Sequence, residues 1–583
     1  MAKGGLFEVC LVLALLPIVN PFFIINEKRG INGGFTCATC TVALGLVEQL
    51  AGIHNETVAM SLERLCTYMP LQYQVYCKLG IQYFGPIIIE LFENNETPDV
   101  ICHSLKLCYT EKGSDTCHLF PEPKHGLHKG IKRGQERMKR HLIQTFEKDL
   151  ANILLRKFDI CSLPGLKYLC DYLERIFDEH QPGEDLDGDG FSIISTLRGS
   201  SWRGKDCHDL VADYHPGARP VDSDRKRDSN CNGIYGVDPE SGQPYEDKFC
   251  SETGSIGVVT LGDSVGAHFH APPQWFTPSE ITKDTFANLS FVIENEGDWP
   301  QLSASTGYKN ISWPIISGPT RSVYHRLKLR NRCNHRDYNN LAVNGANSFD
   351  LQKYQKRFKR HIQRDQPALV ILELVGNDVC NHYPDTLKHM TTTEDMQKNI
   401  NGTLHYLASQ LPKGSHLLMI GMADGRFLYK YLHERYHPIG QYKKDVTYPD
   451  LYKWFSCLQV TPCQGWLSTN STLRDLTSQR SKELSQVMKD MAKQYNHTYP
   501  NFDIGYIDCP IGQLFVEWEK THGPGTGWQL IEPVDGFHPN QMANAMFSDI
   551  VWDYLERNLP GFLGKENPHN EEILKIFKDQ GGY

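Results

Sequence analysis

The sequence has almost no long hydrophobic runs. Only residues 6–19, between Lys3 and Asn20-Pro21, are mainly apolar over a sizeable length. They are fewer than the roughly 20 residues that a membrane-spanning helix needs, and they resemble the apolar core of a secretory signal peptide. We therefore predict a cleaved signal peptide over residues 1–23. Because no other run reaches spanning length, we expect a soluble mature protein.

An excess of positive charge is also lacking. The chain has 60 Lys and Arg against 69 Asp and Glu, a formal net charge of −9, which argues against nucleic acid as a partner. It has no tandem repeat or low-complexity tract, and its 40% hydrophobic and 22% charged residues exclude extensive disorder. At ~150 residues per domain, 583 residues allow up to about four domains.

Cysteine, by contrast, is abundant. Of 18 cysteines, Cys10 lies in the predicted signal peptide, and so many in the rest of the chain would be unusual in a reducing cytosol. Asn-x-Ser/Thr sequons, typical of secreted glycoproteins, begin at Asn55, Asn95, Asn288, Asn310, Asn401, Asn470 and Asn496. Because the mature cysteine count is odd, at least one thiol is free or bonded to another molecule.

The composition divides the chain into blocks. We predict a Cys-rich helical domain over residues 33–112, a basic linker over 113–157 and a Cys-rich connector with Asp, Asn and Gly clusters over 158–254. A domain of alternating apolar runs and longer mixed segments follows over 255–560, and residues 561–583 form a C-terminal tail.

The first block has a distinctive cysteine layout. Cys37-x2-Cys40 opens it, Cys66 and Cys77 lie in the middle, and Cys102-x5-Cys108 closes it. Apolar residues at helical spacing occur over residues 43–51, 58–69 and 75–92. Six cysteines allow fifteen pairings, and their spacing alone does not choose among them.

All six cysteine positions resemble those of the saposin-type domain. This resemblance implies the pairs Cys37–Cys108, Cys40–Cys102 and Cys66–Cys77 in a small helical bundle that can press an apolar face onto a lipid aggregate or membrane surface. The alternative is a stapled bundle whose apolar stripes form only its own core.

The linker is rich in Lys and Arg, with dibasic pairs at Lys132-Arg133, Lys139-Arg140 and Arg156-Lys157. Exposed flexible segments favour proteolysis. We expect processing into a small and a large chain joined by a disulfide from Cys117. A contact with anionic headgroups and a merely solvated face are the alternatives.

The connector contains two candidate calcium loops. Asp185, Asp187, Asp189, Gly190 and the carbonyl of Phe191 reproduce positions 1, 3, 5, 6 and 7 of an EF-hand loop. Position 12 is Thr196 rather than Glu, so other ligands must complete the site. The nearby candidates are Asp206, Asp209 and Asp213.

The second loop repeats this spacing with Asn in place of Asp. Its candidate ligands are Asp222, Asp224, Asp228, Asn230, Asn232 and Ile234. Oxygen-only ligands favour Ca²⁺ over Zn²⁺, and we expect a structural role. The alternative is a pair of Asp/Gly turns without metal.

Buried strands are predicted in the large domain at residues 255–261 (SIGVVTL), 368–375 (ALVILELV), 417–420 and 504–507. Continuous apolar runs separated by helix-length segments indicate a parallel α/β sheet. Sites in such sheets lie at the carboxyl ends of the strands, where Ser264 and Asn377 are found.

These residues form a candidate hydrolytic site with Asp535-Gly-Phe-His538. Ester hydrolysis needs an activated hydroxyl, a base, an acid that orients the base and an oxyanion hole. We assign Ser264 as nucleophile, His538 as base and Asp535 as orienting acid. The backbone N–H groups of Ser264 and Gly345 and the Asn377 amide would form the oxyanion hole. His268 and His270 are interpreted as local surface or pocket-lining histidines.

The ordered set resembles the SGNH, or GDSL-type, hydrolase family. Gly-Asp-Ser264, Gly345, Gly376-Asn377-Asp378 and Asp535-x-x-His538 occur in family order, although the third block lacks the usual residue between Gly and Asn. The resemblance implies an esterase over about residues 255–560. The predicted fold class is therefore multidomain, an all-α saposin-type bundle plus an α/β parallel-sheet SGNH hydrolase, with a calcium-binding connector.

The combination of all these parts resembles one family of secreted saposin-containing esterases. It implies action on bacterial lipopolysaccharide, with hydrolysis of the secondary acyl chains of lipid A, possible side activity on glycerophospholipids, and a secreted or lysosomal location. A phospholipase or acyltransferase, a carbohydrate esterase and a non-catalytic lipid-binding protein are the alternatives. Extracting a twelve-carbon chain from an aggregate costs about 10 kcal/mol at ~0.8 kcal/mol per CH₂, and a saposin-type apolar surface could offset that cost.

Overall fold

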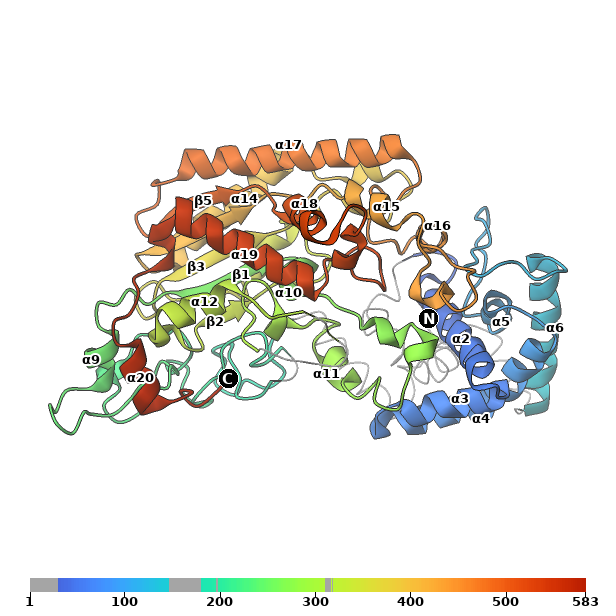
Figure 1. Cartoon of the computed structure of the whole chain (residues 1–583), viewed down its shortest axis with the longest axis horizontal. Coiled ribbons are helices and arrows are strands. Elements are labelled where there is room, and N and C mark those ends of the chain that lie inside the picture. Colours follow the sequence, from blue (N-terminus) through green and yellow to red (C-terminus); the bar gives the residue numbers. More distant parts are fainter. Residues whose placement is uncertain (1–29, 146–179, 196–197, 310–315, 317) are drawn as a thin grey trace.

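The computed structural model describes residues 30–145, 180–195, 198–309, 316 and 318–583. Several predicted features lie outside these residues. They are the signal peptide with Cys10, the Arg156-Lys157 pair, Cys161, Cys170, Thr196 and the sequon at Asn310. A helical small domain lies at one end of the molecule, and a sheet-containing large domain makes up most of the rest (Figure 1).

Within the residues that the structure describes, the small domain contains five helices. They are α2 (Gly34–His54), α3 (Val58–Tyr68), α4 (Leu71–Glu93), α5 (Pro98–Ser104) and α6 (Leu127–Thr145). The three predicted helical segments correspond to α2, α3 and α4, and Thr57 caps α3 by accepting the N–H of Met60. Of the described residues, only α2 is long and apolar enough to span a membrane, and 72% of its most apolar window is buried inside the protein.

The disulfides confirm the saposin-type pairing. Cys37–Cys108, Cys40–Cys102 and Cys66–Cys77 are all formed. Among the described cysteines of the large domain and connector, the pairs are Cys207–Cys231, Cys250–Cys333 and Cys380–Cys463. Cys117 pairs with Cys457, as the predicted link between small and large chains requires. Among the described cysteines only Cys509 is free, and burial raises the pKa of its thiol to about 12.

The large domain is built on a five-stranded parallel sheet in the order β2-β1-β3-β4-β5. The strands are β1 (Gly257–Gly262), β2 (Tyr338–Asn340), β3 (Ala368–Glu373), β4 (Ser415–Ile420) and β5 (Phe502–Ile507). The four predicted strands are confirmed. β2 was not predicted because its sequence, Tyr-Asn-Asn, is polar. Asn340 is nevertheless buried, and its amide donates to the carbonyl of Gly266 at 2.8 Å.

The helices of the connector and large domain include those that link the strands of this sheet. They are α9 (Tyr245–Cys250), α10 (Ser264–Ala267), α11 (Leu289–Glu294), α12 (Val323–Arg330), α13 (Leu351–Tyr354), α14 (Thr393–Gln410), α15 (Arg426–Leu432), α16 (Tyr448–Cys457), α17 (Ser471–Tyr495), α18 (Ile511–His522), α19 (Gln541–Asn558) and α20 (Asn570–Phe577). The longest, α17, packs against α14 and β5.

The C-terminal residues are part of the connector's structure rather than a free tail. Ile573 of α20 is fully buried in a small apolar cluster with Ile234, Phe249 and Cys333. The side chain of Gln580 donates to the carbonyl of Asn232 at 2.7 Å, within the second candidate calcium loop. In Figure 1, α9 and α20 accordingly lie together at the end of the molecule opposite the small domain.

Candidate active site

Ser264 lies at the point where β1 ends and α10 begins. The preceding Asp263 caps α10, because one of its carboxylate oxygens accepts the N–H of Val265 at 3.0 Å. Its other oxygen accepts the N–H groups of Val375 (2.8 Å) and Gly376 (3.3 Å), which follow β3. Asp263 therefore joins the carboxyl ends of two neighbouring strands. Burial raises the pKa of its carboxyl group to about 6.

Three side chains form a continuous hydrogen-bonded chain at this edge of the sheet. The Nε2 of His538 lies 2.7 Å from the Oγ of Ser264, and its Nδ1 lies 2.5 Å from an oxygen of Asp535. Ser264 and His538 are both buried, with 7% and 8% exposure. The partners are 274 residues apart in sequence. The structure thus brings together the nucleophile, base and acid predicted from their motifs.

The segment carrying the acid and base folds tightly on itself. The backbone N–H of His538 donates to Asp535, and the carbonyl of His538 accepts the N–H of Glu532 at 2.7 Å. Gly536 has a positive φ of 61°, and a Cβ there would lie 2.5 Å from the hydroxyl of Tyr452. The turn between acid and base therefore requires glycine.

The predicted oxyanion-hole residues lie beside Ser264. Gly345, with φ 77°, and Asn377 line one cavity together with Ser264 and His538. The Asn377 amide donates to the carbonyl of Ala346 at 3.0 Å, which holds it against the Gly345 turn. The second hydrogen of that amide is available to a ligand, because a primary amide carries two donors.

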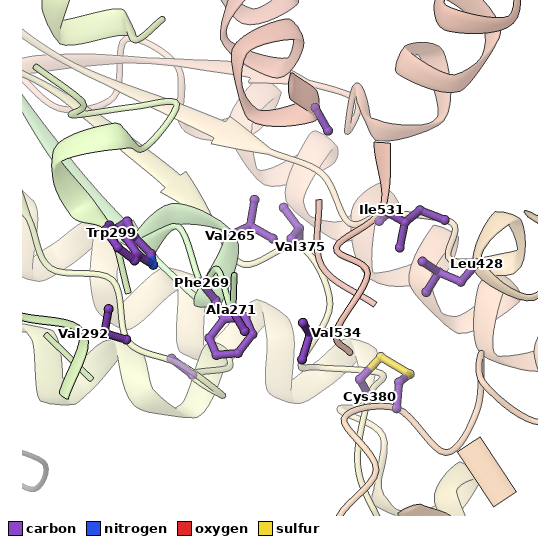
Figure 2. Packing of buried hydrophobic residues seen from close by; sticks show 14 of the residues in the cluster. Val265, Phe269, Ala271, Val292, Trp299, Val375, Cys380, Leu428, Ile531 and Val534 are labelled. Atoms are coloured by element: carbon purple, nitrogen blue, oxygen red, sulfur yellow. A yellow bond between two sulfur atoms is a disulfide. The ribbon is translucent and has the colours of Figure 1, made fainter. Parts of the chain in front are cut away.

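Two cavities meet at Ser264. The smaller is almost entirely apolar. Its wall includes Val265, Val375, Leu428 and Ile531, four of the residues labelled in Figure 2.

The larger cavity lies between the two domains. Phe35, Ala38 and Val42 of α2 form part of its wall, while Leu451 and Phe455 come from α16. The small domain therefore lines the same cavity as the Ser264 hydroxyl. Hydrophobic core packing is also continuous between the two domains.

The interpretation of His268 and His270 as surface or pocket-lining residues is wrong. His268 is fully buried, with its Nε2 2.5 Å from the Oε1 of Gln541. His270 is 5% exposed, and its Nδ1 lies 2.6 Å from the buried carboxylate of Glu532. Each imidazole is hydrogen-bonded to a buried side chain of the 532–541 segment, whereas the imidazole bonded to the Ser264 hydroxyl is that of His538.

The first candidate calcium loop gathers its carboxylates. Oxygens of Asp185, Asp187 and Asp189 lie within 4.8 Å of one another. The N–H of Leu186 donates to Asp209, which places that side chain at the loop. Buried carboxylate oxygens of Asp187, Asp189 and Asp206 have no hydrogen-bond partner. Burial, reinforced by the neighbouring acids, raises the pKa of Asp189 to about 8.

The second candidate calcium loop also contains buried carboxylates that lack hydrogen-bond partners. One buried oxygen each of Asp224 and Asp228 lacks a hydrogen-bond partner. Asn230 and Asn232 both donate to Glu246 at 3.0 Å, a carboxylate that sequence analysis missed. No motif spacing marks Glu246, since it follows Asn232 by fourteen residues on α9. Burial and the nearby acids raise its pKa to about 8.

Two proposed ligands do not join these clusters through their side chains. Asp213 is 61% exposed and forms an ion pair with Arg364. Asp222 is exposed as well, on a short 3₁₀ turn with positive φ. The backbone of the other predicted positions, Phe191 and Ile234, lies in the loops as expected, each N–H donating to the loop residue two positions before it.

Comparison with known proteins covers nearly the whole chain. Residues 36–171 match the saposin-like domain, and residues 258–551 match the GDSL-like lipase/acylhydrolase family. Acyloxyacyl hydrolase of Homo sapiens is 43% identical over 98% of both chains. The acyloxyacyl hydrolases of Oryctolagus cuniculus and Mus musculus are 44% and 42% identical over 94%. These relatives and the apolar N-terminal stretch are consistent with a secreted protein acting on lipid. The chain therefore belongs to the acyloxyacyl hydrolase family and is an ester hydrolase that joins a saposin-like domain to a GDSL-type lipase domain.

Proposed function

We propose that this protein hydrolyses the secondary, acyloxyacyl-linked fatty acyl chains of lipid A in bacterial lipopolysaccharide, and thereby detoxifies it. The observation that supports this most is the junction at Ser264 of an almost entirely apolar cavity and a larger cavity whose wall is mainly apolar but also carries polar side chains. A branched acyl substrate has one chain to release and one that stays on the sugar, so it needs two apolar compartments that meet at the ester. The smaller cavity would take the released chain and the larger cavity the primary chain.

In this mechanism His538 removes the proton of the Ser264 hydroxyl as that oxygen attacks the ester carbonyl. Asp535 accepts the Nδ1–H of His538 and so leaves Nε2 free to act as the base. The oxyanion is stabilised by N–H groups at Ser264 and Gly345 and by the Asn377 amide. His538 then protonates the departing hydroxyl of the primary chain, and water releases the fatty acid from Ser264 in a second cycle.

The small domain has a direct part in this proposal. Transfer of a long acyl chain from a lipid aggregate exposes apolar surface unless protein covers it. Phe35, Ala38 and Val42 offer such a surface beside the reactive hydroxyl. The domain would also bind the lipid aggregate or membrane surface while the substrate enters. We further propose secretion followed by delivery to lysosomes or other vesicles.

The test is mass spectrometry of lipopolysaccharide after incubation with wild-type protein, Ser264→Ala and the control Ser409→Ala. Ser409 is exposed on α14, remote in sequence from every proposed catalytic group. We expect wild type and Ser409→Ala to release secondary chains only, and Ser264→Ala to release none. Release from glycerophospholipid but not from lipopolysaccharide would instead establish a phospholipase, the second candidate. Inactivity of the wild type on all esters would leave a lipid-binding protein.

We also propose that the connector binds Ca²⁺. The donor sets are carboxylate and amide oxygens, which suit a hard cation. Both loops contain buried carboxylate oxygens without a hydrogen-bond partner, and burial raises the pKa values of Asp189 and Glu246. A bound cation at each loop would supply the positive charge that these buried carboxylates need. Asp185, Asp187, Asp189, Asp206 and Asp209 would hold one ion. Asp224, Asp228, Asn230, Asn232 and Glu246 would hold another, and both ions would stabilise the fold rather than take part in catalysis.

A further inference from the structure

One segment of the large domain contacts both the small domain and the catalytic loop. We call residues 437–460, which include α16, the bridging segment, and residues 531–538, which carry Asp535 and His538, the catalytic loop. In Figure 1, α16 accordingly lies beside α2. The bridging segment packs its two sides against two different partners, and each side makes specific polar contacts.

On one side, three side chains of the bridging segment donate to consecutive parts of the catalytic loop. The Nε2 of His437 donates to the carbonyl of Val534 at 2.7 Å. The hydroxyl of Tyr448 donates to the carbonyl of Pro533 at 2.6 Å, and that of Tyr452 donates to the carbonyl of Gly536 at 2.7 Å. All three donors are at most 4% exposed, so water does not compete for these carbonyls.

These bonds fix the backbone on either side of Asp535, and this backbone determines the positions of the Asp535 and His538 side chains. The carbonyls of Val534 and Gly536 flank Asp535, and Gly536 is the turn residue before His538. Burial lowers the pKa of His437 to about 4, so its imidazole is neutral at physiological pH, and its Nε2–H donates to a carbonyl. The loop is therefore held by donors of another segment. His437 also lines the larger cavity, whereas Tyr448 and Tyr452 are not among the residues that line it.

On its other side, the bridging segment contacts the small domain. Gln49 of α2 donates to the carbonyl of Ile439 at 2.7 Å, and Glu48 pairs with Lys443 at 2.7 Å. The N–H of Ile31 donates to the carbonyl of Leu458 at 2.9 Å. Cys457, at the end of α16, forms the disulfide with Cys117.

We propose that His437, Tyr448 and Tyr452 are positioning residues of the hydrolytic reaction, and that seating of the small domain on the bridging segment is transmitted through them to Asp535 and His538. The saposin-type domain thus acts on catalysis through the catalytic loop in addition to any binding of lipid. This effect does not depend on the identity of the lipid, and a soluble substrate reveals it.

The first experiment measures kcat and KM on a soluble short-chain ester for Tyr452→Phe and Tyr448→Phe, which remove only a hydroxyl. The matched control is Tyr338→Phe, because Tyr338 is also buried and donates to a carbonyl, that of Ser200, at 2.7 Å. We expect kcat to fall by about three- to tenfold in the first two variants with KM unchanged, the scale of one neutral hydrogen bond. Tyr338→Phe should lose thermal stability without losing kcat.

The second experiment tests transmission from the small domain. Gln49→Met removes the buried donor to Ile439. Gln72→Met is the control for an exposed contact of the small domain, because Gln72 bonds Ser290, outside the bridging segment, and kcat is compared at temperatures equally far below the melting temperature of each variant. We expect Gln49→Met to lower kcat on the soluble ester about two- to threefold. When it is combined with Tyr452→Phe, the loss of activation free energy should be less than the sum of the two single losses, since coupled residues are non-additive. Gln72→Met should leave kcat unchanged.

The proposal is overturned if Tyr452→Phe and Tyr448→Phe change kcat no more than Tyr338→Phe does at matched loss of melting temperature. It is also overturned if Gln49→Met and Gln72→Met have equal effects on kcat. If a tyrosine variant fails to fold, the comparison between Gln49→Met and Gln72→Met still decides the matter, because both substitutions keep the length of the side chain.

Discussion

Cys117 and Cys457 are bonded across 340 positions of sequence, and their bond fastens the small domain to the last residue of α16. Lys132-Arg133 and Lys139-Arg140, two of the three dibasic pairs, lie within α6. A helix must unfold locally before a protease can bind it, so these pairs are poor cleavage sites despite their exposure.

We expect processing of the linker to occur C-terminal to α6. After processing, non-reducing electrophoresis should show one band, and reduction should release two. Mass spectrometry of the reduced chains should place the new terminus after residue 145. Two bands without reductant would refute the disulfide link, and a terminus at Lys132-Arg133 or Lys139-Arg140 would show that α6 opens readily. Cys457→Ser, which removes the bond, serves as the positive control for two bands.

Replacing Asp535 by Asn should nearly abolish catalysis. The amide cannot stabilise the charged imidazole of His538, and it favours the wrong tautomer, a change that costs about 10³- to 10⁴-fold in kcat in Ser-His-Asp enzymes. Asp553→Asn is the control, because Asp553 is exposed on α19 and pairs only with Arg557. Kinetics on a soluble ester measure the effect. A loss below about tenfold would mean that Asp535 does not orient the base.

The sequence was sufficient for those features whose signal is local. Continuous apolar residues marked β1 and β3, and motif spacing located Ser264 and the Asp535–His538 pair. β2 escaped prediction because the groups that accept hydrogen bonds from its buried Asn340 amide belong to Gly266, Ser303 and Thr306, which are 34 to 74 residues away. His268 was misread for a similar reason, since its partner Gln541 follows it by 273 residues.

In the candidate calcium loops, too, the local ligands could be predicted from the sequence and the distant ones could not. Carboxylates at fixed short spacing were recognisable, whereas Glu246 reaches Asn230 and Asn232 only because α9 folds back onto their loop. Asp213 was a plausible ligand by distance in sequence, yet it pairs with Arg364 on the surface. Spacing identifies the residues of one loop, and the fold decides which distant side chains complete it.

Leu428 should influence which acyl chain the smaller cavity accepts. Its side chain forms part of the cavity wall near Ile531 (Figure 2), and truncation to Ala lengthens the space available. We expect Leu428→Ala to shift the preferred chain toward longer acids, with kcat/KM rising about fourfold for each added methylene that becomes buried, at ~0.8 kcal/mol per CH₂.

The matched control for this change is Leu432→Ala, one turn further along α15. Leu432 is buried to the same 2% exposure but does not line the cavity. Both variants should lose about 2–5 kcal/mol of stability, while only Leu428→Ala should change the ratio of kcat/KM between long-chain and short-chain esters. An equal change in that ratio would assign acyl recognition elsewhere.

Calcium should stabilise the protein more strongly at neutral than at acid pH. Without the ion, the folded-state pKa of Asp189 is raised from 3.8 to about 8, and that of Glu246 from 4.5 to about 8. An acid whose pKa is raised by folding binds more protons in the folded state, so the metal-free protein loses stability as pH rises from about 4 to about 8. Bound Ca²⁺ lets the carboxylates ionise in the folded state and removes this loss.

Melting temperatures in calcium and in chelator should therefore diverge from pH 5 to pH 8. Asp189→Asn should reduce the divergence, and Asp213→Asn should leave it intact. A calcium effect that is absent, or equal at both pH values, would contradict the assignment.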